Sequence, residues 1–515
     1  MLFLAFFLTF FFAAVCADNF AAGSSRFLGT TRKPETIFSI KKFESTVGAI
    51  IDTIGLGNNR SYDHSVPVPK IYGVNIGGWL LSEAWMFPSK WLAMGGQFCS
   101  SCDLCRQSEW SLAEYLGREQ TNAVFKEHWE TWFTQEDVDG IVAAGLNMVR
   151  IPMGFWIIED IVDTATEPYA QGALDQLIRG LTMLRDAGIY VVLDQHAMPG
   201  VSSINQMFAG NCTPTIQFYE SPNDYNYKRA VTWSIVMTYL SHMHPAFKTV
   251  FSLEAINEPE MNYAITPGLD RYEKSFVLGV RVIEFALGII CDDSLAFEAF
   301  FDPITAPALF AAIPIIRRLN SKYNIGGDGI ETVLSFLLQL CSGKGVAEVQ
   351  LGLNIDLCSS RCLSTQFMNR DWQHLANGTV PNPADAARGP QIYDNHLYFN
   401  FGGVAAQNPT AYMQVICNLT RVADAAAISN APLYFGEWAI STAFATNDTF
   451  LKMWGDAQKQ AYSQGAGWSF WAWKVDPDAT VLDQRMWSYR DAIAGGVMTK
   501  KPDEYFTPDV CAPFR

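Results

Sequence analysis

The sequence predicts an α/β fold: a (β/α)8 barrel with an N-terminal extension and a large insertion between its fourth and fifth strands. From residue 70 onward, short runs rich in β-branched and aromatic residues alternate with longer helical patterns, which is typical of βα units around a parallel sheet. The 515 residues exceed the ~250 of a bare barrel and leave room for both additions. Hydrophobic residues make up 49% of the chain and charged residues 17%, which favours a large core and argues against a disordered or coiled-coil protein.

Seven of the eight strands are short runs that we expect at IYGVNIG (71–77), NMVRIPMG (147–154), YVVLDQH (190–196), VFSLEAINEP (250–259), YDNHLYF (393–399), LYFGEW (433–438) and GWSFWAW (467–473). Helical stretches separate most of them. The stretch 134–145 opens on a threonine with acidic residues in its first turn and ends at a glycine. The stretch 174–188 places four leucines on one face, and 272–288 and 449–465 are similar.

The fifth strand must lie between Pro259 and Tyr393, a gap far longer than one helix and one strand need. The best candidates are VQLGLNIDL and CLSTQF, within 349–367. The surplus, about 289–348, is therefore interpreted as an insertion.

The N-terminus predicts export. Residues 1–17 are apolar and close on small residues, so we expect a signal peptide cut before Asp18, with an uncleaved anchor as the alternative. Residues 18–68 show no sustained period and form the predicted extension, and 69–515 form the predicted catalytic domain. No second long apolar run follows, so we expect no membrane association in the mature form.

The number of cysteines is typical of an exported protein with disulfides. Of the 11, Cys16 leaves with the signal peptide, and the remaining ten suffice for up to five disulfides. Zinc is the alternative for the closely spaced Cys99, Cys102 and Cys105, but no histidine sits at finger spacing. Five N-x-[ST] sequons also fit a secreted glycoprotein. We therefore expect an extracellular or cell-wall protein.

Charge and motifs exclude several partners. The formal net charge of −16 without a basic cluster argues against nucleic acid, whose phosphates need cationic partners. The sequence contains no HExxH, phosphate-loop or dinucleotide motif, so we expect neither a cofactor nor a metal. We expect a monomer that binds a polysaccharide or oligosaccharide, for the reasons given next.

Polar residues recur near the ends of the predicted strands, where a barrel carries its active site. They are Asn75, Arg150, His196, Asn257, Glu258, His396, Tyr398, Glu437 and Trp471. Singly, each has an ordinary structural explanation: a glutamate after a strand is usually a helix cap or a surface charge, and WAW is usually core. These explanations do not account for polar residues at the ends of so many strands, because buried strands otherwise favour Val, Ile and Leu.

Two of these residues are carboxylates, and hydrolysis of a glycosidic bond needs one acid and one base or nucleophile. When the two groups lie about 5 Å apart, the second attacks the anomeric carbon and configuration is retained. Strands four and seven lie on opposite sides of an eight-strand ring, so we expect Glu258 and Glu437 to face each other across a sugar. Glu258 would hold the proton and Glu437 would be ionised, with Arg150 favouring the ionised form.

The motifs together resemble glycoside hydrolase family 5, particularly its fungal exo-β-1,3-glucanase branch. The matching segments are YGVNIGGWLLSEAW (72–85), NMVRIPMGFW (147–156), LDQHAMPG (193–200), INEP (256–259), HLYFNF (396–401), FGEW (435–438) and GWSFWAWK (467–474). They span most of the chain and are specific in combination.

The resemblance implies a retaining mechanism with Glu258 as acid/base and Glu437 as nucleophile. It implies supporting or sugar-binding roles for Arg150, His196, Asn257, His396, Tyr398 and Trp471. Glu83 resembles the carboxylate that grips sugar hydroxyls in the −1 subsite, and Phe401 resembles one half of an aromatic clamp at the pocket mouth. Phe208 is a candidate for the other half.

The sequence departs from that branch in LDQHAMPG, in the following stretch VSSINQMFAGN, in the cysteines near 99–105 and in the insertion. We therefore predict an exo-acting β-1,3-glucan hydrolase and keep three alternative substrates open: β-1,6-glucan, a β-mannan and a glycolipid glycoside. A non-catalytic wall-binding barrel is the remaining alternative.

Overall fold

The computed structural model describes residues 65–291, 298–299, 302–326, 357–373, 378–479, 481 and 483–515. The predicted signal peptide, nearly all of the predicted extension and much of the predicted insertion lie outside these residues. The chain divides into two compact units, and every described residue except Gly326 belongs to the unit formed by Tyr62–Ile325 and Leu357–Arg515.

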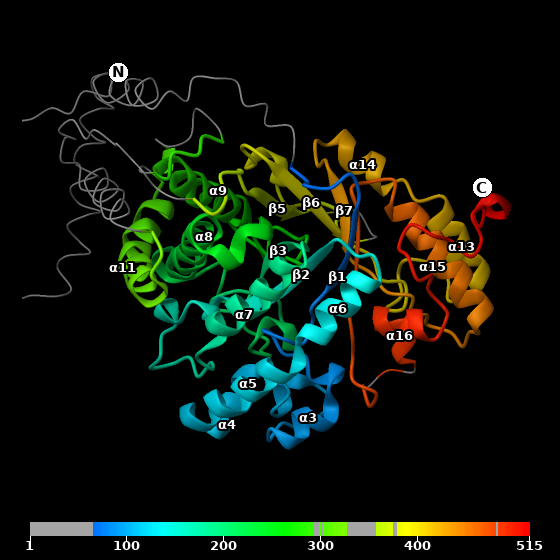
Figure 1. Ribbon diagram of the computed structural model, residues 1–515, viewed down its shortest axis with the longest axis horizontal. Helices are drawn as coiled ribbons and strands as arrows, with labels where there is room; N and C mark the ends of the chain where they lie inside the picture. Colours follow the sequence, from blue (N-terminus) through cyan, green and yellow to red (C-terminus); the bar gives the residue numbers. More distant parts are fainter. Residues whose placement is uncertain are drawn as a thin grey trace, which may run out of the picture. The chain divides into compact units, whose positions relative to one another are not determined.

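Eight parallel strands close into a barrel in chain order, which confirms the predicted fold (Figure 1). They are β1 (Ile71–Asn75), β2 (Met148–Gly154), β3 (Tyr190–Ala197), β4 (Val250–Glu254), β5 (Ser364–Met368), β6 (Gln391–His396), β7 (Leu433–Glu437) and β8 (Gly467–Phe470). The ring closes where β8 pairs with β1, with Ile71 opposite Gly467. The barrel interior is filled by a buried cluster of Ile71, Met148, Val192, Phe251, Ile392 and Tyr434.

Helices surround the barrel, with α8, α9 and α11 on the side opposite α13 and α15 (Figure 1). The α-helices are α3 (Pro88–Ala93), α4 (Glu109–Leu116), α5 (Arg118–Trp132), α6 (Gln135–Ala143), α7 (Ala173–Asp186), α8 (Tyr225–Met243), α9 (Leu269–Ala286), α11 (Thr305–Tyr323), α13 (Pro409–Cys417), α14 (Arg421–Ala427), α15 (Asp448–Tyr462) and α16 (Tyr489–Ala494). No helix among the described residues has the length and apolar character needed to cross a membrane.

Local signals set the helix ends. The α6 helix begins after Thr134 in a capping box with Asp137, as its sequence predicts. Gly145 and Gly188 follow α6 and α7 with φ values of 71° and 73°, a conformation that glycine adopts at little cost. These two helices therefore lie where the sequence places them, to within a few residues.

Five strands end earlier than predicted, and three of them end three or more residues early. The fourth ends at Glu254, the sixth at His396 and the eighth at Phe470. The predicted runs continue because the loops beyond these strands are also apolar and buried, as at Ile256, which is 1% exposed. Periodicity reports burial, so it does not distinguish a strand from the buried loop after it. The fifth strand corresponds to the second of the two candidate runs.

Within the predicted insertion, α11 packs against α8 and α9. The Thr305 hydroxyl donates to the carbonyl of Ser275 in α9 at 3.2 Å. The Tyr239 hydroxyl of α8 donates to Asn320 Oδ1 of α11 at 2.6 Å. Helix α11 therefore forms part of the helical layer around the barrel.

Four disulfides join described residues: Cys99–Cys105, Cys102–Cys212, Cys291–Cys362 and Cys417–Cys511. They confirm the disulfide prediction over the alternative of zinc at Cys99, Cys102 and Cys105. Cys341 lies outside the described residues. Cys102–Cys212 ties the segment before α4 to the loop that follows β3.

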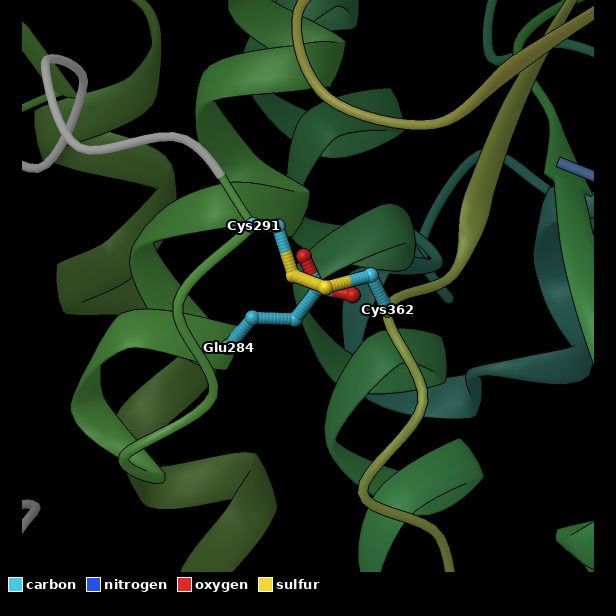
Figure 2. Close-up of side chains that lie close together, drawn as sticks. All are labelled: Glu284, Cys291 and Cys362. Carbon is cyan, nitrogen blue, oxygen red and sulfur yellow. A yellow bond between two sulfur atoms is a disulfide. The ribbon is translucent and has the colours of Figure 1, made fainter. Parts of the chain in front are cut away.

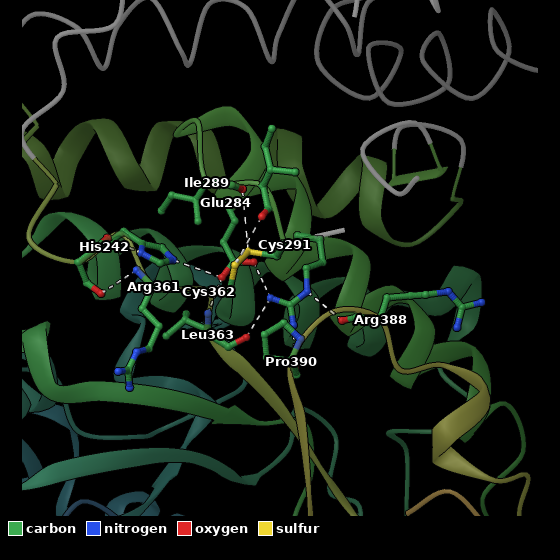
Figure 3. Close-up of a disulfide and its surroundings, with 12 residues drawn as sticks. His242, Glu284, Ile289, Cys291, Arg361, Cys362, Leu363, Arg388 and Pro390 are labelled. Carbon is green, nitrogen blue, oxygen red and sulfur yellow. Dashed lines mark hydrogen bonds and ion pairs between the residues drawn. A yellow bond between two sulfur atoms is a disulfide. The ribbon is translucent and has the colours of Figure 1, made fainter. Parts of the chain in front are cut away.

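A buried charged network lies at the amino-terminal entrance of β5 and β6, beside the Cys291–Cys362 disulfide (Figures 2 and 3). Glu284 of α9 accepts hydrogen bonds from Arg281 Nη1 at 2.5 Å and from the backbone N–H of Leu363 at 2.7 Å. Arg281 also donates to the carbonyls of Leu363, Arg388 and Pro390. The network therefore fastens α9 to the two strand entrances.

Candidate active site

A cavity of about 690 Å³ opens over the carboxyl-terminal ends of the strands. Its size falls in the range of roughly 300–1,000 Å³ typical of small-molecule sites. Most of the predicted site residues line it: Glu83, His196, Asn257, Glu258, His396, Tyr398, Phe401, Glu437 and Trp471. Arg150 is 0% exposed and does not line the cavity, which favours a supporting role over sugar contact.

The two predicted acids lie close together in this cavity. Glu437 is the last residue of β7, and Glu258 lies in the loop after β4. One carboxylate oxygen of each, together with a ring nitrogen of His396, lies within 4.8 Å of the other two atoms. Glu258 has a φ of 41°, which is uncommon for a residue other than glycine and directs this side chain from a tight turn.

His396 connects the two acids. Its Nδ1 lies 2.7 Å from Glu258 Oε1 and 3.6 Å from Glu437 Oε2. Burial lowers the pKa of His396, but the negative charges of Glu437 and Asp394 and the hydrogen bonds to Asp394 and Glu258 outweigh it, so the pKa is raised well above its ordinary value. His396 is therefore a cation and donates to Glu258.

Glu437 accepts two further hydrogen bonds, from Arg150 Nη1 to Oε1 at 2.8 Å and from the Tyr398 hydroxyl to Oε2 at 2.9 Å. Burial raises the pKa of Glu437, and the positive charges of His396 and Arg150 limit that rise. Burial and the nearby carboxylates raise the pKa of Tyr398 well above its ordinary value, so its hydroxyl stays neutral and acts as a donor.

Arg150 is the hub beneath the cavity floor. It donates to Asn75, Glu254, Asn257 and Glu437 and pairs with Asp194 at 2.9 Å. Asp394 lies 3.7 Å from its Nε. Burial raises the pKa of Glu254 well above its usual range. Glu254 therefore holds a proton, which reduces the negative charge crowded around Arg150. Contacts to residues of β1, β3, β4, β6 and β7 fix the guanidinium in place.

His196, Asn257 and Trp471 form another part of the cavity wall. His196 Nδ1 donates to Asp194 Oδ2 at 2.6 Å, and Asn257 Nδ2 donates to His196 Nε2 at 3.1 Å. The His196 ring stacks with that of Trp471, with centroids 6.1 Å apart. Phe208 also lines the cavity and packs edge-on against His196 at 5.4 Å.

Glu83 approaches from the loop after β1. Trp85 Nε1 donates to its Oε2 at 2.8 Å. Burial raises the pKa of Glu83 to about 7; the hydrogen bond from Trp85 opposes the rise, and the negative charges of Glu437 and Glu258 add to it. Three carboxyl groups thus share one cavity with different environments.

Several functional residues were missed from the sequence. Asp194, Glu254 and Asp394 are 0% exposed, and a charge inside a buried strand is the signal that identified Arg150 and fits them equally well. Trp85, Trp372 and Trp487 also line the cavity. These tryptophans lie outside the strands and carry no comparable signal.

Three groups of described residues have the proximity that a metal site needs. Glu284, Cys291 and Cys362 do not fit a metal, because the two sulfurs are bonded to each other and offer no thiolate (Figure 2). The other two groups both include His396, with Glu258 and Glu437 or with Glu254 and Asp394. The raised pKa of His396 opposes metal binding at both groups, because a metal ion would have to displace the ring proton.

Two carboxylic acids, one at the end of β7 and one in the loop after β4, share one cavity, which is the arrangement that a glycoside hydrolase needs. The model for cellulases of glycosyl hydrolase family 5 matches residues 117–477, and the chain belongs to that family. It is an O-glycosyl hydrolase.

Known proteins extend the similarity over most of the chain. It is 28% identical over 453 residues to glucan endo-1,6-beta-glucosidase B of Emericella nidulans, covering 86% of this chain and 88% of that protein. It is 25% identical over 462 residues to a probable glucan 1,3-beta-glucosidase A of Aspergillus niger, covering 88% and 93%. The rutinosidase of Aspergillus niger shares the fold, with a TM-score of 0.50, 18% identity and coverage of 83% and 97%.

Proposed function

We propose that this protein is a retaining hydrolase of β-glucan that acts by double displacement, with Glu437 as nucleophile and Glu258 as acid/base. The observation that carries the proposal is the approach of the two carboxylates to within 4.8 Å. Retaining enzymes separate these groups by about 5–5.5 Å, whereas inverting enzymes leave room for a water at about 6.5–9.5 Å.

The contacts support a role for each group in the two steps. In the first step Glu437 attacks the anomeric carbon, while Glu258 gives its proton to the departing glycosidic oxygen. Oε2 of Glu258 is assigned to proton transfer, because Oε1 accepts a hydrogen bond from His396. In the second step the Glu258 carboxylate removes a proton from water, which attacks the same carbon and releases Glu437. Arg150 and Tyr398 hold Glu437 in line.

The roles are tested with azide as an external nucleophile and an aryl β-glucoside with an activated leaving group. Glu437→Ala is expected to lose at least about a thousandfold in kcat/KM. Azide should then form an α-glycosyl azide, because it enters from the vacated side. Glu258→Ala should give the β-glycosyl azide. The same product from both variants, or near wild-type activity of Glu437→Ala, contradicts the assignment. Binding without turnover by the wild type would favour a non-catalytic barrel.

For the linkage we propose β-1,6-glucan first and β-1,3-glucan second. Relatives named for endo-1,6 cleavage are 26–28% identical to this chain, and those named for 1,3-β-glucosidase activity are 25% identical. The exo mode on β-1,3-glucan predicted from the sequence is the second candidate. Product analysis on pustulan and laminarin decides between them, and a preference for mannan or a glycolipid glycoside rejects both.

We further propose that the protein is secreted to the extracellular space or cell wall and has lost residues 1–17. The disulfides among the described residues support an oxidising compartment. N-terminal sequencing of secreted protein is expected to begin at Asp18. Retention of the leader in a membrane fraction would support the anchor instead.

A further inference from the structure

The loop after β3, residues 198–213, forms one wall of the active-site cavity. Gln206, Met207 and Phe208 of this loop line the cavity. The ring of Phe208 packs edge-on against that of His196, with centroids 5.4 Å apart. The conformation of this segment, which we call the β3 loop, therefore determines the shape of the cavity on this side.

The β3 loop has a backbone conformation that its own residues disfavour. Val201 and Asn205 have φ values of 67° and 53°, in the left-handed region. That region is strained for a β-branched residue such as valine, and such strain persists only where the surrounding structure enforces it. Ile204 is 40% exposed and so contributes little packing. Contacts with other parts of the protein must therefore stabilise the conformation of the loop.

Residues 97–116, which we call the cysteine segment, fasten the β3 loop at two points. The Cys102–Cys212 disulfide joins the two segments, and its cysteines are 9% and 7% exposed. The N–H of Trp110 donates to the carbonyl of Gly210 at 2.9 Å. The disulfide is the covalent one of these two contacts, so it does not open in thermal fluctuations as a hydrogen bond does.

The cysteine segment is itself anchored to the chain that follows β1. The carbonyl of Arg106 accepts a hydrogen bond from the indole N–H of Trp91 at 2.9 Å, and Glu109 accepts one from the backbone N–H of Ser82 at 2.7 Å. Ser82 directly precedes Glu83, which lines the cavity. The disulfide therefore links the β3 loop to a support that is fixed beside the same cavity.

The β3 loop also rests on aromatic rings. Gly210 has a φ of 78° and lies so close to Trp156 that an added Cβ would be 2.4 Å from its ring. Trp156 stacks on Tyr169 with centroids 3.8 Å apart, and Trp110 packs edge-on against Tyr169 at 5.5 Å. The loop thus has one defined seat, and the disulfide lies two residues from the glycine that occupies it.

We propose that the Cys102–Cys212 disulfide is a positioning bond for substrate binding: it holds the β3 loop in its strained conformation and so keeps one wall of the cavity in place before a glucan binds. The inference rests on the proposed β-glucan hydrolysis and adds a determinant of affinity to it. The unusual cysteines near 99–105 and the unusual stretch 201–211 are then two parts of one structural device.

Loss of the bond has a specific kinetic consequence. Without it the β3 loop relaxes into other conformations, and the substrate must order the loop again when it binds. Because only a fraction of the free enzyme is then competent to bind, KM rises by the inverse of that fraction. The value of kcat is measured on the bound enzyme, in which the loop is ordered, and stays nearly unchanged.

The experiment measures KM and kcat on a linear glucan oligosaccharide of the linkage that the wild type cleaves. Cys102→Ser with Cys212→Ser is expected to raise KM about fivefold or more and to keep kcat within about twofold. Cys99→Ser with Cys105→Ser is the matched control, because that bond lies within the cysteine segment, and its KM should stay within about twofold of the wild type. A role in stability alone would lower the active fraction, and hence kcat, at unchanged KM.

A smaller rise of KM in the first serine pair, an equal rise in both pairs, or a larger fall in kcat overturns the proposal. If circular dichroism shows that the first pair is unfolded, Cys102→Ala with Cys212→Val replaces it under the same thresholds, because these side chains fill the buried site with apolar atoms. If that pair is unfolded as well, the bond serves the fold itself and the proposal is overturned.

Hydrogen exchange distinguishes failure of the positioning role from failure of the proposed function, because it needs no substrate. In the folded loop the N–H groups of Ala209 and Gly210 donate to backbone carbonyls of the same loop. Peptides covering 201–211 should therefore exchange faster without the disulfide than in the wild type. Unchanged exchange refutes the positioning role even in an active enzyme. A wild type that cleaves neither β-1,6- nor β-1,3-glucan oligosaccharides refutes the proposed function, and the exchange result still decides whether the disulfide positions the loop.

Discussion

The side chains around Glu258 and Glu437 differ in their charged neighbours although they are close together. Glu437 is paired with cations and a neutral phenol, while Glu83 is paired with an indole N–H. Glu258 receives its hydrogen bond from a protonated histidine. The cations beside Glu437 limit the rise of its pKa that burial causes, whereas the pKa of Glu83 rises to about 7.

Glu83 is expected to make substrate binding depend on pH near neutrality. Its pKa is raised to about 7, so the group is neutral below that pH and ionised above it. An ionised carboxylate accepts stronger hydrogen bonds from sugar hydroxyls. KM for an oligosaccharide should therefore increase as the pH falls through 7, and Glu83→Gln should abolish this dependence. The measurement is KM from pH 5 to 8.5. If KM of Glu83→Gln depends on pH as it does in the wild type, Glu83 is not the group responsible.

Arg150 is expected to be indispensable to the fold as well as to activity. Arg150→Met removes the cation and leaves Asp194 and Glu437 buried without it, so unfolding should become easier by about 3–5 kcal/mol. Urea denaturation measures this loss. Lys126→Met is the control, because the Lys126–Glu130 pair is exposed and should contribute less than about 1 kcal/mol. Equal losses of unfolding free energy in the two variants would contradict the stabilising role of Arg150.

At the scale of elements, the loops after the strands carry much of the chemistry, and helices fix their conformation. Glu109, the first residue of α4, accepts a hydrogen bond from the backbone N–H of Ser82 at 2.7 Å. Ser82 directly precedes Glu83. Helix α4 therefore positions a loop that reaches the cavity from β1.

Glu109 is expected to make the protein less stable as the pH rises. Burial raises its pKa to about 8, although hydrogen bonds from Ser82 oppose the rise. The folded protein keeps this proton while the unfolded chain releases it above its ordinary pKa of 4.5. Stability is therefore full below pH 4.5 and falls up to pH 8, by a few kcal/mol.

The test is urea denaturation of wild type and Glu109→Gln at pH 5 and pH 8. The glutamine still accepts the bond from Ser82 but does not titrate, so the variant should lose less stability between the two pH values. Glu114→Gln, an exposed position on the same helix, should behave as the wild type. If Glu109→Gln loses as much stability between pH 5 and pH 8 as the wild type, groups other than Glu109 cause the loss.

At the scale of the molecule, the two ends of the barrel have separate tasks. The carboxyl-terminal end holds the cavity, and the amino-terminal entrance of β5 and β6 holds the Glu284 network and the Cys291–Cys362 disulfide (Figure 3). Burial raises the pKa of Glu284, but Arg281 and His242 outweigh it and the pKa is lowered overall. This end therefore contains an ionised pair that serves stability.

Loss of the Cys291–Cys362 disulfide is expected to reduce stability without changing the chemistry. The bridge spans 71 positions, and constraining the unfolded chain over such a loop is worth about 2–4 kcal/mol. Cys291→Ser with Cys362→Ser should lower Tm and leave kcat at 25 °C within about twofold of the wild type. Cys99→Ser with Cys105→Ser, which opens a separation of 6, should cost less. A large loss of kcat in the first double variant contradicts the separation of tasks.

The barrel was predictable because each strand is a short apolar run and glycines end the helices. The gathering of Glu258 and Glu437 was predictable because parallel strands bring their carboxyl ends to one rim. Trp372 and Trp487 were not predictable, because loop conformation determines which tryptophan reaches the cavity. Asp194, Glu254 and Asp394, the buried partners of Arg150, were also missed, since they lie on strands far apart in the sequence.

The hub at Arg150 has a consequence for how this enzyme can change. One guanidinium contacts residues of five strands, so replacing any partner disturbs all the others. Variation is therefore expected in the outer loops, such as those that carry Phe401 and Trp487. New specificities in this lineage should arise at the rim while the floor stays fixed.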